Sequence, residues 1–242
     1  VSVAPMVDVT DRHFNHMCSL ISNRPTLYTE MLHARAVLGK REQLYQLMGP
    51  PVPDQLVVQL GGNEPEFMAR AAEILENYGV RALNLNLGCP SEKVQHCKYG
   101  AVLMKDPDLV VSICRAISAV SSLPLSIKCR IGVDDLDSQD FLDDFIHQLT
   151  SRTAVRHVII HARKALLQNI KAKKNLTVPP LNYDRAYRLK ARFPDLTVDI
   201  NGGIADLATV RTHLKVMDGV MLGRKIMKDP LFLHDLACDL EG

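Results

Sequence analysis

Residues 82–104 read ALNLNLGCPSEKVQHCKYGAVLM. Leucines alternate with two asparagines from Leu83 to Leu87, which predicts a β-strand with one apolar side and one polar side. Gly88 would let a ligand approach the backbone, and Pro90 would end the hydrogen-bonded ladder. Binding residues are often held in this way at the end of a rigid element. We therefore expect Cys89 to face a ligand site at the end of this strand.

Seven further apolar runs occur along the chain, and helical patterns separate them. The eight runs cover residues 1–7, 26–31, 56–60, 82–87, 125–131, 157–161, 196–200 and 218–222. Repeated alternation of strand and helix favours an α/β fold, a closed (β/α)8 TIM barrel whose parallel strands lie beneath helices. The alternative is an open doubly wound sheet, but no GxGxxG motif follows the first run. We expect one domain over residues 1–242.

Short local signals mark where several helices begin and end. Asn63 precedes Pro65 and a following glutamate, a pattern typical of an N-cap with a capping box. Gly79 would end that helix in a left-handed conformation. Asp106 and Ser138 are expected to cap two further helices.

Composition limits the class of protein. A formal net charge of +2 neither requires nor excludes an anionic partner, because a balanced total can include a local basic patch. The six cysteines form no CxxC pair, which favours reduced thiols and predicts no zinc or other metal site. No apolar run approaches the roughly 18 residues of a membrane span. We expect a monomer with no membrane partner, in the cytoplasm, or in an organelle if a targeting leader precedes Val1.

In a barrel of this type the carboxyl ends of all strands surround one site. The residues expected there are Ala4, Pro5, Met6, Glu30, Gln59, Asn86, Cys89, Lys128, Arg130, His161, Arg163, Asn201, Gly202, Gly203, Gly223 and Arg224. Apolar strands with such polar ends predict a ligand that has a planar hydrogen-bonding ring and an anionic tail.

The anionic tail can be assigned to one part of this site. The segment Asn201–Gly203 follows the seventh run, and Gly223 and Arg224 follow the eighth and open a helix. Backbone N–H groups, a helix dipole and one cation commonly form a phosphate site there in barrels. Lys128 and His161 would then lie beside the ring. A lysine within a buried strand also needs a partner, which such a ligand would supply.

Nine ordered segments resemble one known family. They read VAPMVDVTDRHF, YTEM, QLGGN, LNLNLGCPSEKVQ with YGAVLMKDP, IKCRIG, IHARKA, PPLNY, DINGGI and MDGVMLGRKIMKDP, and they span nearly the whole chain. Together they are similar to the flavin-dependent tRNA-dihydrouridine synthases, and in particular to the A-type branch.

The resemblance implies an FMN site and a catalytic residue. Cys89 matches the family's catalytic acid, and Asn86 matches a residue that contacts the target base or tRNA. The positions that match the family's FMN contacts are Pro5, Met6 and Val7 near the ring, Gln59, Lys128 and His161 at the flavin and ribityl chain, and Asn201, Gly202, Gly203, Gly223 and Arg224 at the phosphate.

The resemblance also implies the reaction. NADPH would reduce FMN, the reduced flavin would give hydride to C6 of a uracil, and Cys89 would give a proton to C5. Thiols are largely protonated at neutral pH, which suits this role. A positive Lys128 would stabilise the anionic reduced ring.

The implied substrate is a uridine of the tRNA D-loop, in the region of position 20, turned out of its stack. The residues expected to contact tRNA are Arg163, Lys164, Lys173 and Asn175, with further rim cations at Lys98, Lys171 and Lys174.

The chain departs from the family pattern at two places. Leu176 stands where relatives usually have an arginine. The family's C-terminal helical domain, which grips tRNA, is expected to be absent because the chain ends at Gly242, soon after the eighth run.

Three other functions stay open at this stage. The first is an FMN barrel of the dihydroorotate dehydrogenase type, which has a similar N-x-x-C-P turn and acts on a free pyrimidine. The second is a phosphate-binding aldolase or isomerase barrel without flavin, because glycine-rich phosphate sites occur in many barrels. The third is a tRNA-binding module that no longer catalyses a reaction.

Overall fold

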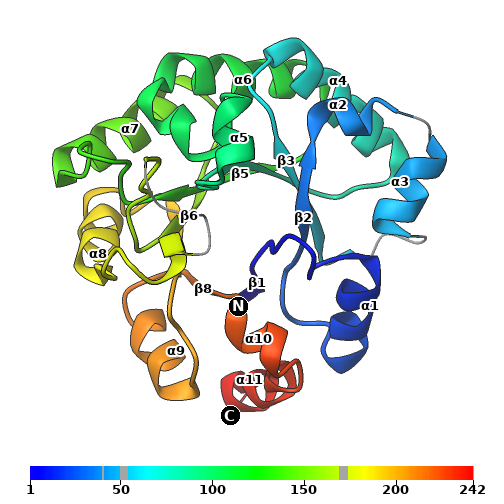
Figure 1. Cartoon of the computed structure of the whole chain (residues 1–242). Helices are drawn as coiled ribbons and strands as arrows, with labels where there is room; N and C mark the ends of the chain where they lie inside the picture. The colour runs from blue at the N-terminus through cyan, green and yellow to red at the C-terminus, as the bar shows by residue number, and fades with distance from the viewer. Residues whose placement is uncertain (40, 50–53, 169–173, 242) are drawn as a thin grey trace.

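The computed structural model describes residues 1–39, 41–49, 54–168 and 174–241. Within these residues eight parallel strands form one sheet in the order β1-β8-β7-β6-β5-β4-β3-β2. They are β1 (Ser2–Val3), β2 (Leu27–His33), β3 (Leu56–Gly61), β4 (Leu83–Leu87), β5 (Leu125–Arg130), β6 (His157–His161), β7 (Thr197–Asn201) and β8 (Gly219–Leu222). A parallel bridge between Ser2 and Thr26 brings the two edges of the sheet together. The expected (β/α)8 barrel is confirmed (Figure 1).

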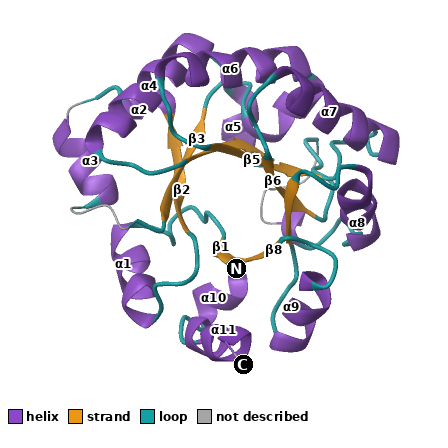
Figure 2. Ribbon diagram, turned by 180° about the vertical axis from the view of Figure 1, so that it is seen from behind, coloured by secondary structure: helices purple, strands orange, loops and turns teal. Residues whose placement is uncertain are grey.

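Helices surround the strands as an outer ring (Figure 2). They are α1 (Arg12–Ile21), α2 (Ala34–Val37), α3 (Arg41–Met48), α4 (Pro65–Tyr78), α5 (Glu92–His96), α6 (Pro107–Val120), α7 (Gln139–Arg152), α8 (Tyr183–Arg192), α9 (Leu207–Leu214), α10 (Arg224–Lys228) and α11 (Phe232–Glu241), with 3₁₀ turns η1 (Gly100–Lys105) and η2 (Lys174–Leu176). Among the helices described, none has the length and hydropathy needed to cross a lipid bilayer.

Three of the predicted helix ends are confirmed. The Asp106 carboxylate accepts a hydrogen bond from Leu109 N at 3.0 Å, and Ser138 Oγ accepts one from Phe141 N at 3.0 Å. Each side chain thereby satisfies one of the free N–H groups at its helix start. Gly79 ends α4 with a φ of 101°, in the left-handed region.

The predicted N-cap at Asn63 is wrong. Helix α4 begins at Pro65, so Glu64 is the N-cap residue, and its side chain makes no capping hydrogen bond. Proline is favourable at the first helical position because it lacks the N–H group that would remain unpaired. The Glu64 carboxylate instead pairs with Arg35 of α2 at 2.8 Å.

The first strand is shorter than predicted. The apolar run at residues 1–7 forms a strand only over Ser2–Val3. Pro5 has no N–H to donate to a sheet, and the chain then turns. Thr10 N donates to the Met6 carbonyl at 2.9 Å, and Met6 N donates to Thr10 Oγ1 at 2.9 Å. This turn leaves Val7 largely exposed rather than in the core.

Side chains of β4 show how the barrel separates its core from its site. Leu83, Leu85 and Leu87 are fully buried in the main hydrophobic core. The asparagines between them point the opposite way, because side chains alternate along a strand, and so they lie inside the barrel. A second small cluster inside the barrel contains Ala4, Tyr28, Val57, Ile159 and Met221. Ala4 and Met221 of this cluster also line the cavity above it.

Candidate active site

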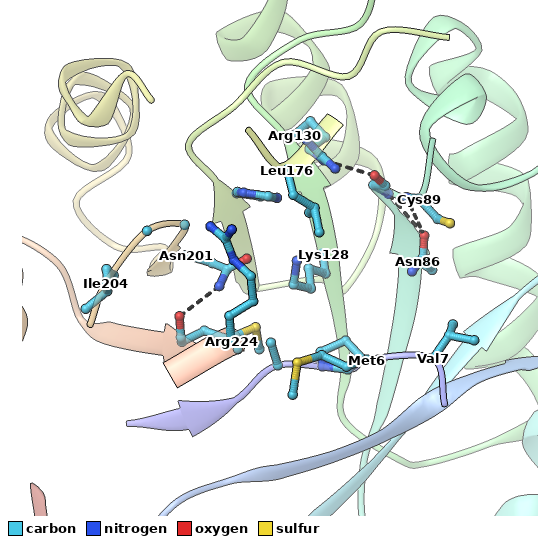
Figure 3. A pocket seen from close by; sticks show the side chains of 18 of the residues that line it. Met6, Val7, Asn86, Cys89, Lys128, Arg130, Leu176, Asn201, Ile204 and Arg224 are labelled. Atoms are coloured by element: carbon cyan, nitrogen blue, oxygen red, sulfur yellow. Dashed lines mark hydrogen bonds between the residues drawn. The ribbon is translucent and has the colours of Figure 1, made fainter. Parts of the chain in front are cut away.

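One cavity of about 440 Å³ opens at the carboxyl ends of the strands. It brings together residues from both ends of the chain and from most strands (Figure 3). All of the residues that the sequence assigned to a cofactor line it, together with the candidate catalytic residue and its neighbour: Pro5, Met6, Val7, Gln59, Asn86, Cys89, Lys128, His161, Asn201, Gly202, Gly203, Gly223 and Arg224. Their individual roles stay predictions.

Cys89 lies in a turn that Asn86 holds in place. Asn86 Oδ1 accepts hydrogen bonds from Gly88 N at 3.1 Å and from Cys89 N at 3.0 Å. On the other side, Ala101 N donates to the Cys89 carbonyl at 2.9 Å. Figure 3 shows Cys89 and Asn86 on one side of the cavity, with Asn201 and Arg224 across from them. The cavity therefore has a thiol at one end and a cation at the other.

The Lys128 side chain is a half-buried cation in the cavity wall. Burial and, to a smaller extent, the neighbouring Arg130 guanidinium together lower its pKa to about 8. Among the residues that the structure describes, its ammonium group has no hydrogen-bond or ion-pair partner. A buried charge without a partner is costly. Lys128 therefore favours an anionic or strongly hydrogen-bonding ligand.

Arg130 also lines the cavity, although the sequence analysis placed it at the strand end without giving it a role. Its Nε donates to the Gly88 carbonyl at 3.0 Å, and its Nη1 donates to the Asn175 carbonyl at 3.3 Å. It therefore links the turn before Cys89 to the β6–α8 connection. Arg130 follows Lys128 by two residues, so both side chains lie on the same side of β5. This spacing could have predicted that Arg130 lines the cavity.

His161 is expected to be neutral at physiological pH. Burial lowers its pKa well below the usual value, and the positive charges of Arg130 and Lys128 lower it further. A neutral imidazole presents one hydrogen-bond donor and one acceptor. It can therefore bind a polar ligand ring without adding charge.

The anion-binding end is formed by a tight turn after β7 and by the start of α10. Gly202 and Gly203 have φ values of 122° and 73°, which favour glycine. Tyr183 donates its hydroxyl hydrogen to the Gly202 carbonyl at 2.6 Å, and Asn201 Nδ2 donates to the Met221 carbonyl at 2.8 Å. These bonds hold the glycine turn next to Arg224.

Replacing Gly202 with alanine is expected to lower the free energy of unfolding by about 2–4 kcal/mol, from backbone strain plus overpacking. The new Cβ would lie 2.8 Å from His161 Cδ2 and 2.8 Å from Leu181 Cδ2. Gly79→Ala is a matched control, because Gly79 also has a positive φ, 101°, but nothing lies within 4 Å of its Cβ position. Urea unfolding of both variants measures the difference. Equal losses would show that the side chains of His161 and Leu181 do not restrict this turn.

The charges around the cavity select the sign of its ligand. The lining contains five cationic side chains: Lys128, Arg130, Arg224, Lys225 and Lys228. None of its described residues is Asp or Glu. Nor do the described parts of the chain contain a cluster of three or more His, Cys, Asp or Glu side chains that could hold a metal. The site is therefore suited to an anion.

Two of the residues predicted to contact tRNA are largely buried in the free protein. Asn175 has no exposed surface; its side chain accepts from Leu166 N at 2.7 Å and donates to the Leu166 carbonyl at 2.9 Å. Arg163 is only 9% exposed and donates to the carbonyl groups of Thr177 and Pro179. Both side chains bond backbone groups of described residues between β6 and α8, and their contacts with tRNA stay predictions.

The other residues predicted to contact tRNA differ in exposure and in ion pairing. Lys164 is half-buried and pairs with Asp137 at 2.7 Å, so part of its charge is already used. Lys98 and Lys174 are exposed. Lys173 and Lys171 lie outside the described residues, and their contacts stay predictions.

Several lining residues were missed by the sequence analysis. Met31, Ile204, Ala205 and Met221 form apolar parts of the wall, and Leu176 reaches it from η2. An apolar residue at a strand end gives no signal that separates ligand contact from core packing. Lys228 could have been found, because it lies four residues after Arg224 on a helix and therefore on the same face.

Comparison with known protein families identifies the family of this chain. The family model described as dihydrouridine synthase matches residues 2–240. The chain belongs to the dihydrouridine synthase family. The resemblance seen in the nine sequence segments is confirmed.

Relatives within the dihydrouridine synthase family are similar over the whole chain. A protein of Xanthomonas campestris pv. campestris is 45% identical over 100% of this chain and 72% of its own length. A protein of Escherichia coli K12 is 45% identical over 100% of this chain and 69% of its own length. A protein of Yersinia pestis is 43% identical over 99% of this chain and 69% of its own length. All three are named tRNA-dihydrouridine(20/20a) synthase.

A solved structure, a 2-naphthoyl-CoA reductase in complex with 2-naphthoyl-CoA, supports the fold alone. It superposes with a TM-score of 0.69 at 11% sequence identity, and the match covers 98% of this chain and 49% of the reductase. At this identity the similarity extends to the barrel and not to the ligand.

Proposed function

We propose that this dihydrouridine synthase reduces a uridine in the D-loop of tRNA, in the region of position 20, to 5,6-dihydrouridine. The observation that carries the proposal is a single cavity with Cys89 at one end and an anion-binding turn at the other. The relatives named tRNA-dihydrouridine(20/20a) synthase support the substrate, because they are 42–45% identical over the whole chain.

We further propose that the cavity binds FMN. Its volume, about 440 Å³, lies within the usual range for cofactor sites, about 300–1,000 Å³. The residues fit the group. The half-buried Lys128 ammonium, which has no partner among the described residues, suits an electron-rich ring, and the glycine turn beside Arg224 suits a phosphate. No Asp or Glu among the described lining residues would lie directly against that phosphate.

The two ends of the cavity would hold different parts of FMN. Gly202, Gly203, Gly223 and Arg224 would bind the phosphate, with Asn201 shaping the turn. The residues that would contact the ring and ribityl chain are Pro5, Met6, Val7, Gln59, Lys128 and His161. When bound, FMN would take hydride from NADPH and supply it to C6 of the uracil.

The protein's own side chains would manage the proton and the charge. Cys89 would hold a proton at Sγ and deliver it to C5 of the uracil as a general acid. Lys128 would stabilise negative charge on the ring, and such a fixed cation acts strongly where water is excluded. Asn86 would keep the Cys89 turn closed through its two backbone hydrogen bonds.

Access to this cavity requires the uridine to leave its stack. Turning a base out costs about a few kcal/mol, and less where the loop is already open. The exposed cations Lys98 and Lys174 would attract tRNA phosphates near the barrel mouth. A free pyrimidine has no chain of phosphates to reach cations outside the cavity, which favours tRNA over the dihydroorotate type of substrate.

The function is tested by mapping dihydrouridine in tRNA from cells that lack this gene. We expect the D-loop dihydrouridine near position 20 to disappear in the deletion strain and to return with the wild-type gene but not with Cys89→Ala. Purified protein should also fail to turn over free orotate or dihydroorotate. Unchanged dihydrouridine at every D-loop position of the deletion strain would refute the proposal.

A further inference from the structure

A chain of buried side chains connects the inside of the barrel to Cys89. Ser126 Oγ donates to the Leu83 carbonyl at 3.2 Å and accepts from Asn84 Nδ2 at 2.9 Å. Asn84 Oδ1 accepts from Gln59 Nε2 at 2.7 Å. Gln59 Oε1 then accepts from Asn86 Nδ2 at 2.7 Å. The exposed fractions of Ser126, Asn84, Gln59 and Asn86 are 7%, 0%, 1% and 8%, so water has little access to replace these bonds.

The direction of every amide in this chain is fixed. The backbone N–H groups of Gly88 and Cys89 can only donate, so Asn86 must turn its Oδ1 toward them. Its Nδ2 must then face the oxygen of Gln59, and the nitrogen of Gln59 must face the oxygen of Asn84. The Asn84 nitrogen therefore needs an acceptor, and Ser126 Oγ provides it. A flipped amide anywhere along the chain would set two donors or two acceptors against each other.

We propose that Ser126 and Asn84 are positioning residues of the active site, which act through Gln59 and Asn86 to set the turn that carries Cys89. Neither residue lines the cavity, so neither touches a bound ligand directly. The proposed function is needed only to say which reaction these residues support. The effect on the Cys89 turn follows from the hydrogen bonds alone.

The chain also determines how Gln59 meets a ligand. Each polar atom of Gln59 uses one hydrogen bond within the chain, which leaves one N–H on Nε2 and one lone pair on Oε1. Because Asn84 and Asn86 fix which atom lies where, the donor and acceptor of Gln59 have fixed places in the cavity wall. Removing the Ser126 hydroxyl leaves the Asn84 N–H without its acceptor, and a buried unpaired group favours rearrangement of the amides.

The test compares Ser126→Ala with Ser126→Thr, which restores a hydroxyl. Two quantities are measured: kcat and KM for tRNA, and the rate at which iodoacetamide alkylates Cys89, followed by peptide mass spectrometry. We expect Ser126→Ala to lower kcat about tenfold and to leave KM unchanged. Tenfold is the effect expected when the arrangement that holds the Cys89 turn loses roughly one buried hydrogen bond. Cys89 should be alkylated several-fold faster because its turn loosens, and Ser126→Thr should return both rates toward wild type.

Tyr187→Phe is the matched control. It removes a hydroxyl that bonds His213 Nδ1 at 2.7 Å between α8 and α9, away from the cavity lining, and should leave both rates unchanged. Wild-type kcat and alkylation rates in folded Ser126→Ala would overturn the inference, as would a folded Ser126→Thr that behaves like Ser126→Ala. If the wild-type protein makes no dihydrouridine but the alkylation rates change as expected, the proposed function fails and the positioning role stands.

Discussion

Cys89→Ala is expected to slow the oxidation of reduced flavin by tRNA about 10²–10⁴-fold, the usual contribution of a positioned general acid. The variant keeps the turn, because the bonds to Asn86 and Ala101 involve only the backbone of residue 89. It loses only the Sγ atom and its proton. Reduction of the flavin by NADPH should proceed at the wild-type rate, since it does not use this proton.

Stopped-flow absorbance at the flavin band separates the two half-reactions. Cys97→Ala is the control: Cys97 is an exposed thiol on the same connection after β4, and its loss should leave both half-reactions unchanged. If Cys89→Ala oxidised its reduced flavin with tRNA as fast as wild type, Cys89 would not be the proton donor. If Cys97→Ala removed the activity instead, the acid would have been assigned to the wrong thiol.

Lys128→Met is expected to weaken FMN binding about 10- to 100-fold, which corresponds to about 1.4–2.7 kcal/mol for a lost charge-assisted interaction. Methionine keeps most of the side-chain length but removes the charge. The apoprotein should remain folded, because Lys128 has no hydrogen-bond or ion-pair partner among the described residues. Quenching of FMN fluorescence on titration with apoprotein measures the affinity.

The same lysine should make FMN binding depend on pH. Lys128 in the free protein has its pKa lowered to about 8, so it is mostly charged below pH 8 and mostly neutral above it. An anionic ligand raises this pKa, and affinity should therefore fall as pH rises above about 8. The fall should be absent in Lys128→Met. The exposed Lys215 supplies a control of equal charge change, and Lys215→Met should bind like wild type. Equal affinity of Lys128→Met and wild type at pH 7 would remove Lys128 from the site.

The barrel and the outline of its cavity could be predicted from the sequence because buried parallel strands are short and apolar. Polar residues at their ends, such as Gln59, Lys128 and His161, therefore stand out from the pattern. Their meeting in one cavity follows from the geometry of a closed barrel. The glycine turn after β7 could be predicted for a similar reason, since adjacent glycines mark a backbone that side chains would obstruct.

Residues in the connections could not be assigned in this way. Arg163 and Asn175 have the chemistry of a tRNA contact, yet both side chains are largely buried and bond backbone groups of Leu166, Thr177 and Pro179. Sequence periodicity carries no information about such bonds. The N-cap of α4 was placed one residue too early because asparagine is preferred at N-caps and glutamate is not. Glu64 takes that position without a capping bond, and its carboxylate pairs with Arg35.

The interior of β4 shows a further limit. Alternation in LNLNL places Asn84 and Asn86 on one side of the strand, but it cannot reveal their different partners. Asn86 bonds the turn that carries Cys89, whereas Asn84 bonds Ser126 on the neighbouring strand. Only the register between β4 and β5, which pairs Asn84 with Ser126, brings these two side chains together.

The central claim is that Cys89 and the anion-binding turn serve one bound flavin. The most direct measurement is a crystal structure of the protein after FMN has been added. We expect the phosphate to contact Gly203 and Arg224, and the ring to lie beside Lys128 with Cys89 facing it. Electron density that places FMN outside this cavity, or that turns Cys89 away from the ring with a hydrophobic side chain between them, would contradict the claim.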